Sequence, residues 1–159
     1  MAELIDGKRI STIIKDECKK KVEEYKAQGT EICLAVIQVG NDPASSVYVN
    51  NKKKACEVCG IKSYEYALPA ETSEDQLLEL IDALNTDEKV NGILVQLPLP
   101  RHLDEEKVIK RISPLKDVDA FSAENVGKIM IGNYAFLPCT PAGCMELIHS
   151  TGIEVSGKE

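Results

Sequence analysis

The sequence lacks any stretch of about 20 apolar residues, the length that a membrane-spanning helix needs. Its first ten residues, MAELIDGKRI, also lack the uninterrupted apolar core of a signal peptide. Basic residues are not in excess, because 19 Lys and Arg stand against 26 Asp and Glu, which gives a formal net charge of −7. We therefore expect a cytoplasmic protein that binds neither membranes nor nucleic acid.

Phosphate-binding glycine motifs are also absent: the chain has neither GxGxxG nor GxxxxGK[ST], so no nucleotide cradle is expected in it. The only CxxC, Cys56 and Cys59, lies inside an expected helix with no second CxxC and only two histidines in the chain. A metal or redox role for this pair is a minor alternative. A chain of this size does not need disulfides, so we expect most of the six cysteines to be reduced core thiols.

What the sequence does contain is typical of one globular domain: 159 residues, 43% apolar and 28% charged. Apolar periodicity predicts alternating helices and strands, and three strands joined by helices predict an α/β fold, an open parallel sheet with helices on both faces in three αβα layers. The stretch 113–128 is expected to be irregular. The expected helices are 8–28, 45–59, one capped by Ser73, 104–112 and one capped by Thr140, and the expected strands are 32–39, 61–68 and 93–97.

Candidate ligand residues follow the predicted strands, because open α/β sheets bind ligands beyond the carboxyl ends of their strands. Tyr48 and Lys52 share one helix face at i and i+4, and Gln96 is an amide in an otherwise apolar strand. Asp117 and Asp119 alternate in a loop. Taken alone, a solvated helix face is the commoner explanation for Tyr48 and Lys52, and an ordinary polar loop is the commoner one for the two aspartates. Gln96 is less easily explained in this way, because a buried amide needs hydrogen-bond partners.

The segments VGNDPASSVYVNNKKKACEVCGI, NGILVQLPLP, SPLKDVDAF with NVGK, and FLPCTPAGCMELI, in this order, closely resemble the methylenetetrahydrofolate dehydrogenase/methenyltetrahydrofolate cyclohydrolase family. The resemblance implies that residues 1–150 are the folate-binding catalytic domain. It implies that 151–159 are a linker toward an absent Rossmann domain that binds NADP or NAD. It also implies that the whole protein has about 280 residues and forms a homodimer. Its role would lie in the one-carbon metabolism that supplies purine and amino-acid biosynthesis.

The resemblance also assigns roles. Lys52, Gln96 and Tyr48 would be catalytic, with no cofactor or metal ligand in this chain. Tyr48 would stack on the pterin and Asp119 would accept its N–H groups. Lys52 would be the base that activates water, kept neutral by a cationic folate and by Lys53 and Lys54, while Gln96 would hold it. The implied substrate-binding residues are Tyr48, Asp119, Gln96, Val95, Leu97 and Pro98.

Two positions depart from the family pattern. Ala120 stands where members commonly carry Gly, which matters only if the position needs a positive φ, and Ser122 stands where many carry His or another larger residue. A different interpretation of the chain is a ligand-binding or dimerisation module without turnover of its own.

Overall fold

The computed structural model describes residues 4–157. Three strands form one parallel sheet in the order β2-β1-β3, with β1 (Cys33–Val39) in the centre between β2 (Lys62–Leu68) and β3 (Gly92–Val95). The predicted parallel α/β sheet is therefore confirmed. The helices are α1 (Gly7–Ala27), α2 (Pro43–Cys59), α3 (Glu74–Thr86), α4 (Glu105–Arg111), α5 (Ala123–Met130) and α6 (Cys139–His149).

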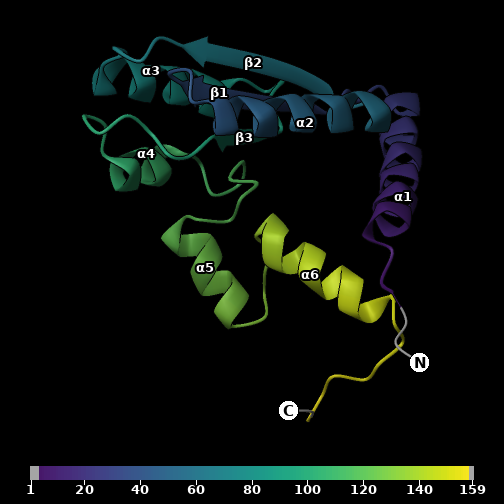
Figure 1. Cartoon of the computed structure of the whole chain (residues 1–159). Coiled ribbons are helices and arrows are strands. Elements are labelled where there is room, and N and C mark those ends of the chain that lie inside the picture. Colours follow the sequence, from purple (N-terminus) through teal and green to yellow (C-terminus); the bar gives the residue numbers. More distant parts are fainter. Residues whose placement is uncertain (1–3, 158–159) are drawn as a thin grey trace.

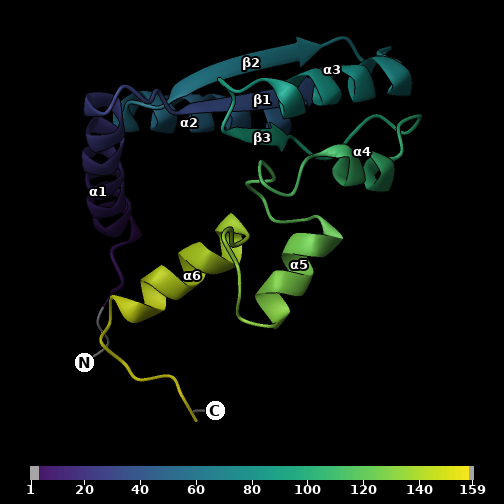
Figure 2. The ribbon, with the colours of Figure 1, turned by 180° about the vertical axis from the view of Figure 1, so that it is seen from behind.

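Helices cover both faces of the sheet, as Figures 1 and 2 show: α2 lies on one face and α3 on the other. Alternate residues of β1 point to the α3 face, where Ala35 and Ile37 are fully buried against Leu77 and Ile81. Val36 is buried on the opposite face, the face of α2. Because both faces are covered, the strands read as continuous apolar runs.

The capping box predicted at the start of α3 is confirmed. The backbone N–H of Gln76 donates to the Ser73 hydroxyl at 3.3 Å, and the Ser73 N–H donates to the Gln76 side chain at 3.0 Å. This reciprocal pair satisfies two of the backbone donors that a helix leaves free at its first turn.

Three local predictions are wrong. The stretch expected to be irregular contains α5, an eight-residue helix that Ser122 caps by accepting from the N–H of Asn125; a helix of about two turns is too short for its period to stand out in the sequence. Thr140 does not cap α6, because the helix already begins at Cys139 after Pro138 and no side chain caps it. The third strand ends at Val95 rather than at Leu97, so Gln96 lies just outside it.

Helices α5 and α6 lie beside the sheet and not on it, and α6 contacts the amino-terminal part of α1 (Figure 1). No residue of α6 is buried, and Asn125 is the one buried residue of α5. Met130 and Ile131 are 82% and 76% exposed. These two helices therefore present apolar side chains that nothing in residues 4–157 covers.

Candidate active site

Two of the predicted residues stand on α2. The helix begins where the Asp42 carboxylate accepts from the N–H of Ser45 at 2.7 Å, with Pro43 in the first turn. This start lies two residues before the predicted one. One and a half turns later come Tyr48, which is 60% exposed, and Lys52, which is half-buried at i+4 on the same face. The helix thus presents a ring and an amine side by side.

Gln96 reaches the same place from the sheet. Side chains alternate along β3, so Ile93 and Val95 face the α3 core, while Leu94 and Gln96 face α2. The Lys52 amine donates to Gln96 Oε1 at 2.9 Å. Gln96 Nε2 donates to the Leu97 carbonyl at 2.7 Å, and this bond fixes the orientation of the amide. The predicted juxtaposition of Lys52 and Gln96 is therefore present.

Asp119 completes the group from the loop before α5. Burial raises the pKa of Asp119, Lys52 opposes that shift, and the carboxylate of Asp117 adds to it. The side chain is thus partly removed from water and close enough to Lys52 for their charges to interact. The structure therefore joins Lys52 to Gln96 by a hydrogen bond and places Asp119 within electrostatic reach of the lysine, with the exposed Tyr48 one turn earlier on α2.

The other predicted residues lie differently. The Val95 side chain is buried in the core on the α3 face, opposite to Lys52, so it does not belong to this group. Leu97 is half-buried against the same core and offers its carbonyl to Gln96. Pro98 is exposed and follows a cis peptide bond.

Cys139 is a residue that sequence reasoning did not assign to the site. It is the first residue of α6, and its pKa is raised by loss of hydration and by Asp119, while Lys52 lowers it. Its thiol therefore lies within electrostatic reach of both groups. Nothing in helical or strand periodicity could have shown this, because α6 is far along the chain from α2.

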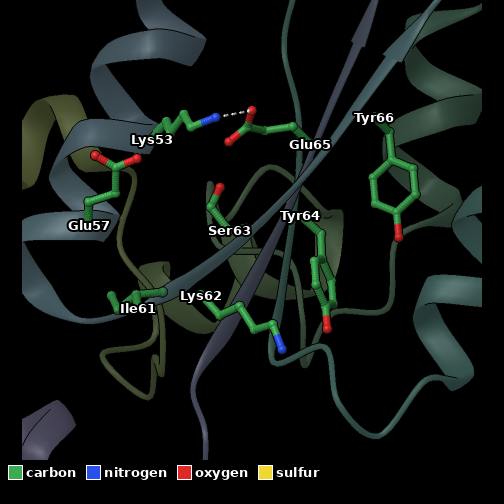
Figure 3. Close-up of a pocket in the computed structure, with 8 residues that line it drawn as sticks. All are labelled: Lys53, Glu57, Ile61, Lys62, Ser63, Tyr64, Glu65 and Tyr66. Carbon is green, nitrogen blue, oxygen red and sulfur yellow. Dashed lines mark hydrogen bonds and ion pairs between the residues drawn. The ribbon is translucent and has the colours of Figure 1, made fainter.

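Lys53 lies outside the site, contrary to the expectation that its charge helps to keep Lys52 neutral. Its amine forms an ion pair with Glu65 on β2 at 2.9 Å, so its charge is compensated. The pair spans a shallow cavity of about 670 Å³ along the outer edge of β2, where Figure 3 shows Lys53 and Glu65 facing each other above Ser63 and Lys62. The cavity holds none of Tyr48, Lys52, Gln96 and Asp119, so it is a separate feature of the sheet edge.

The CxxC thiols are structural. Cys56 and Cys59 are buried between α2 and α1, and burial together with Cys18 raises the pKa of Cys59 to about 11. A protonated buried thiol is a poor nucleophile and metal ligand. Among residues 4–157, no group of three metal-ligating side chains is close enough to hold an ion. All six cysteines are free; Cys33, Cys56 and Cys59 are buried as expected, while Cys139 and Cys144 are exposed.

None of the helices described between residues 4 and 157 is long and apolar enough to cross a membrane. The fold and the site together define a class: an α/β domain with a lysine, an amide and a carboxylate at the carboxyl edge of a parallel sheet. The particular family follows from comparison with known proteins. Residues 5–119 match the model of the tetrahydrofolate dehydrogenase/cyclohydrolase catalytic domain, and the chain belongs to that family.

Curated relatives and solved structures agree with this assignment. The bifunctional protein FolD of Agathobacter rectalis is 63% identical over 158 residues, which are 99% of this chain and 57% of the relative. The crystal structure of the Campylobacter jejuni FolD methylenetetrahydrofolate dehydrogenase/cyclohydrolase superposes with a TM-score of 0.94 at 49% identity, over 98% of this chain and 55% of that one.

A third similar structure carries ligands. The Trypanosoma brucei methylenetetrahydrofolate dehydrogenase-cyclohydrolase, described as a complex with NADP cofactor and inhibitor, gives a TM-score of 0.93 at 35% identity. It is matched over 98% of this chain and 54% of its own length. The chain thus spans a little over half the length of the relatives it matches.

Proposed function

We propose that the whole protein is a bifunctional enzyme of one-carbon folate metabolism. It would oxidise 5,10-methylene-tetrahydrofolate to the 5,10-methenyl form with NADP and hydrolyse the methenyl form to 10-formyl-tetrahydrofolate. The observation that carries the proposal is the Lys52–Gln96 hydrogen bond, set beside Asp119 in a member of this family. Residues 1–150 would be the folate domain, of which 1–3 lie outside the described residues.

NADP, or NAD, would be held by the part of the protein that the relatives have beyond this chain. Side chains already cap the two helices that follow β1 and β2: Asp42 accepts from the first turn of α2 and Ser73 from that of α3, so neither of these two helix starts is free to hold a phosphate. Residues 151–159 would lead into the cofactor part, and residues 158 and 159 lie outside the described range. The uncovered apolar side chains of α5 and α6 support a further packed layer there.

Binding of the folate would rest on Tyr48 and Asp119. The exposed phenol ring of Tyr48 offers a flat surface for stacking on the pterin and aminobenzoate rings, which aligns the reacting carbon without needing charge. Asp119 would accept the pterin's amino and ring N–H groups, and ionised carboxylates form the stronger class of such hydrogen bonds. The cofactor supplies hydride chemistry when it is bound, and the residues of this chain supply orientation.

Lys52 would be the base for hydrolysis. A neutral amine has two N–H donors and one lone pair, and the bond to Gln96 Oε1 uses one donor while leaving the lone pair free for a water molecule. Because Gln96 Nε2 is tied to the Leu97 carbonyl, its oxygen is the atom that faces the lysine. Gln96 would therefore hold the amine in place while a water is deprotonated beside the methenyl carbon.

Compartment and assembly are also part of the proposal. We propose a cytoplasmic protein; its net charge of −7 disfavours binding to nucleic acid, and the family resemblance favours a homodimer of the whole protein that serves purine and amino-acid biosynthesis. The other function considered is a binding module without turnover. The pairing of Lys52 with Gln96 favours the enzyme, because a purely binding site does not need a half-buried amine held by an amide.

The experiment compares the whole protein with residues 1–159 alone. We expect the whole protein to reduce NADP with 5,10-methylene-tetrahydrofolate and to hydrolyse the methenyl form. The shorter chain should bind folate weakly and reduce no NADP, because one wall of the cleft is missing and water reaches the reacting carbon. A whole protein that binds folate but turns over neither substrate is a binding module. Nicotinamide reduction by residues 1–159 would overturn the assignment of NADP to the missing part.

A further inference from the structure

Asp117 is a buried carboxylate that the proposed chemistry does not use. Only 2% of its surface is exposed, and its backbone pairs with Ile93 as an isolated parallel bridge on the edge of β3 that faces away from β1. One residue earlier, the carbonyl of Lys116 accepts from the N–H of Ile93 at 2.7 Å. The start of the loop that carries Asp119 is thus attached directly to the central sheet.

The Asp117 side chain closes this loop on itself. Its Oδ2 accepts from the backbone N–H of Ser122 at 2.8 Å and from the Asn125 side chain at 3.1 Å. The Asn125 amide also donates to the carbonyl of Pro114 at 2.9 Å, on the far side of the loop. The N–H of Ala120 donates to the Asp117 carbonyl at 3.1 Å. One oxygen of the Asp117 carboxylate therefore connects the two ends of the turn 117–122, and the same oxygen ties the turn to the first turn of α5.

This turn has Asp119 at its centre. Asp119 is two residues from the buried carboxylate and three from Ser122, so its position depends on how the turn is closed. Ala120, the next residue, has φ +55 and is fully buried, which is a costly conformation for a residue with a Cβ. A turn that contains this conformation needs contacts on both sides to keep it, and Asp117 supplies them.

We propose that Asp117 is a positioning residue: its buried carboxylate clamps the turn 117–122 and so holds Asp119 beside Lys52, ready for the pterin ring. The ligand in this inference rests on the proposed folate function, whereas the clamp itself does not. The charged and titratable groups around Asp119 are Lys52 from α2, Cys139 from α6 and Asp117 from its own loop. The charge of Asp117 raises the pKa of Asp119, so the clamp also has an electrostatic effect that can be measured.

The test is Asp117→Asn in the whole protein. Both hydrogen bonds go to one oxygen, so the Asn side-chain oxygen can accept both and the fold should persist. A neutral amide accepts more weakly than a carboxylate, so the turn should loosen. We expect the KM for 5,10-methenyl-tetrahydrofolate to rise about tenfold, the effect of weakening one charged hydrogen bond, with kcat within about threefold. The Asp119 carboxyl, followed by carbon NMR, should titrate at lower pH than in wild type.

The matched control is Glu124→Gln, which removes a negative charge from the exposed side of α5, where Glu124 pairs with Lys128. It should change neither KM nor the titration of Asp119. If Asp117→Asn does not fold, Asn125→Ala removes one of the two donors to the clamp and should raise KM by about threefold with kcat retained.

The two readouts separate the clamp from the proposed function. A wild-type protein that hydrolyses no methenyl-tetrahydrofolate would contradict the function, and the Asp119 titration alone would then decide on the clamp. An Asp117→Asn protein with unchanged KM and an unchanged Asp119 titration overturns the inference. So does an Asn125→Ala protein with wild-type KM, in the event that Asp117→Asn does not fold.

Discussion

Lys52 and Gln96 are 44 positions apart in the sequence, yet the lysine amine donates to the glutamine side-chain oxygen at 2.9 Å. The contact joins α2 to the end of β3 across the carboxyl edge of the sheet. Two facts of local structure produce it: Lys52 is on the helix face that looks at the sheet, and the alternation along β3 turns Gln96 to that same side. Both residues stand on regular elements, which hold side chains more precisely than loops do.

The lysine itself gives the first prediction. Lys52→Met keeps most of the apolar stem and removes the amine, so methenyl-tetrahydrofolate hydrolysis by the whole protein should fall by about 10²–10⁴-fold, as is typical when a positioned base is lost. The folate KM should change much less. Lys20→Met, at an exposed position on α1, is the control and should stay near wild type. A Lys52→Met rate within threefold of wild type, a difference of only ~0.65 kcal/mol, would remove the lysine from the mechanism.

Asp119 gives a prediction about stability and pH. Its pKa is raised in the folded protein, chiefly by burial, above the ordinary value of 3.8. A group whose pKa is raised on folding contributes its full stabilisation when the pH is below the ordinary pKa. That contribution is lost as the pH rises through the folded-state pKa. At pH 7 the ionised side chain therefore destabilises the fold, and Asp119→Asn should raise the Tm of the whole protein at pH 7, while the difference should disappear by about pH 3.5.

Asp82→Asn is the control with the opposite sign. Arg111 donates to both Asp82 oxygens at 2.6 Å and lowers the pKa of that carboxyl, so its stabilising effect is present at pH 7 and is lost as the pH falls. Asp82→Asn should therefore lower the Tm of the whole protein at pH 7. If both variants shift the Tm in the same direction at pH 7, the environment assigned to Asp119 is wrong.

Ala120 and Ala35 form a matched pair for backbone strain. Both are fully buried, but Ala120 has φ +55 while Ala35 lies in the central strand. Replacing a buried Ala by Gly loses about 0.8 kcal/mol of methyl burial and about 0.5–1 kcal/mol through chain entropy. At Ala120 the same substitution also relieves the strain of the left-handed conformation, which recovers about 1–2 kcal/mol of stability. Urea unfolding should show Ala35→Gly destabilised by about 1.5 kcal/mol and Ala120→Gly nearly unchanged; equal losses would contradict the strain.

Much of the fold and part of the site followed from periodicity alone. The buried runs predicted the parallel sheet because strands covered on both faces are apolar throughout, and the i, i+4 spacing placed Tyr48 and Lys52 together. The folate roles, in contrast, came from the family resemblance. The direction of the Val95 side chain could have been read from the sequence: if Gln96 faces α2, strand alternation turns its neighbour to the other face.

Other features could not be read from the sequence. The helix α5 is short, carries a glycine and begins at the Ser122 cap, so its eight residues offer only about two turns in which a period can be recognised. Cys139 comes near Lys52 and Asp119 only through the path of the chain after α5, which no local pattern encodes. The positive φ of Ala120 depends on the closed turn around Asp117, which is a tertiary arrangement.

Gly92, the first residue of β3, gives the last prediction, because the loop that carries Asp119 lies directly against it. A Cβ at Gly92 would come 2.5 Å from Cγ1 of Val118 and 3.3 Å from Cδ1 of Leu34. Overpacking of this kind typically costs about 1–3 kcal/mol. We expect Gly92→Ala to push Val118 outward, lower the stability of the whole protein and raise its folate KM through displacement of Asp119.

The double variant Gly92→Ala with Val118→Ala removes the clashing methyl, since Cβ of Val118 is 3.9 Å from the added carbon. The remaining tight contact is with Cδ1 of Leu34 at 3.3 Å, the end of a flexible side chain. The double variant should recover most of the lost stability and the folate KM, whereas Val118→Ala alone should weaken stability only by the loss of its own packing. Because the two residues touch, their effects should be strongly non-additive in a double-mutant cycle. A double variant that is as impaired as the sum of the two single variants would mean that the loop is not held by this contact, and that Asp119 takes its position from the Asp117 turn alone.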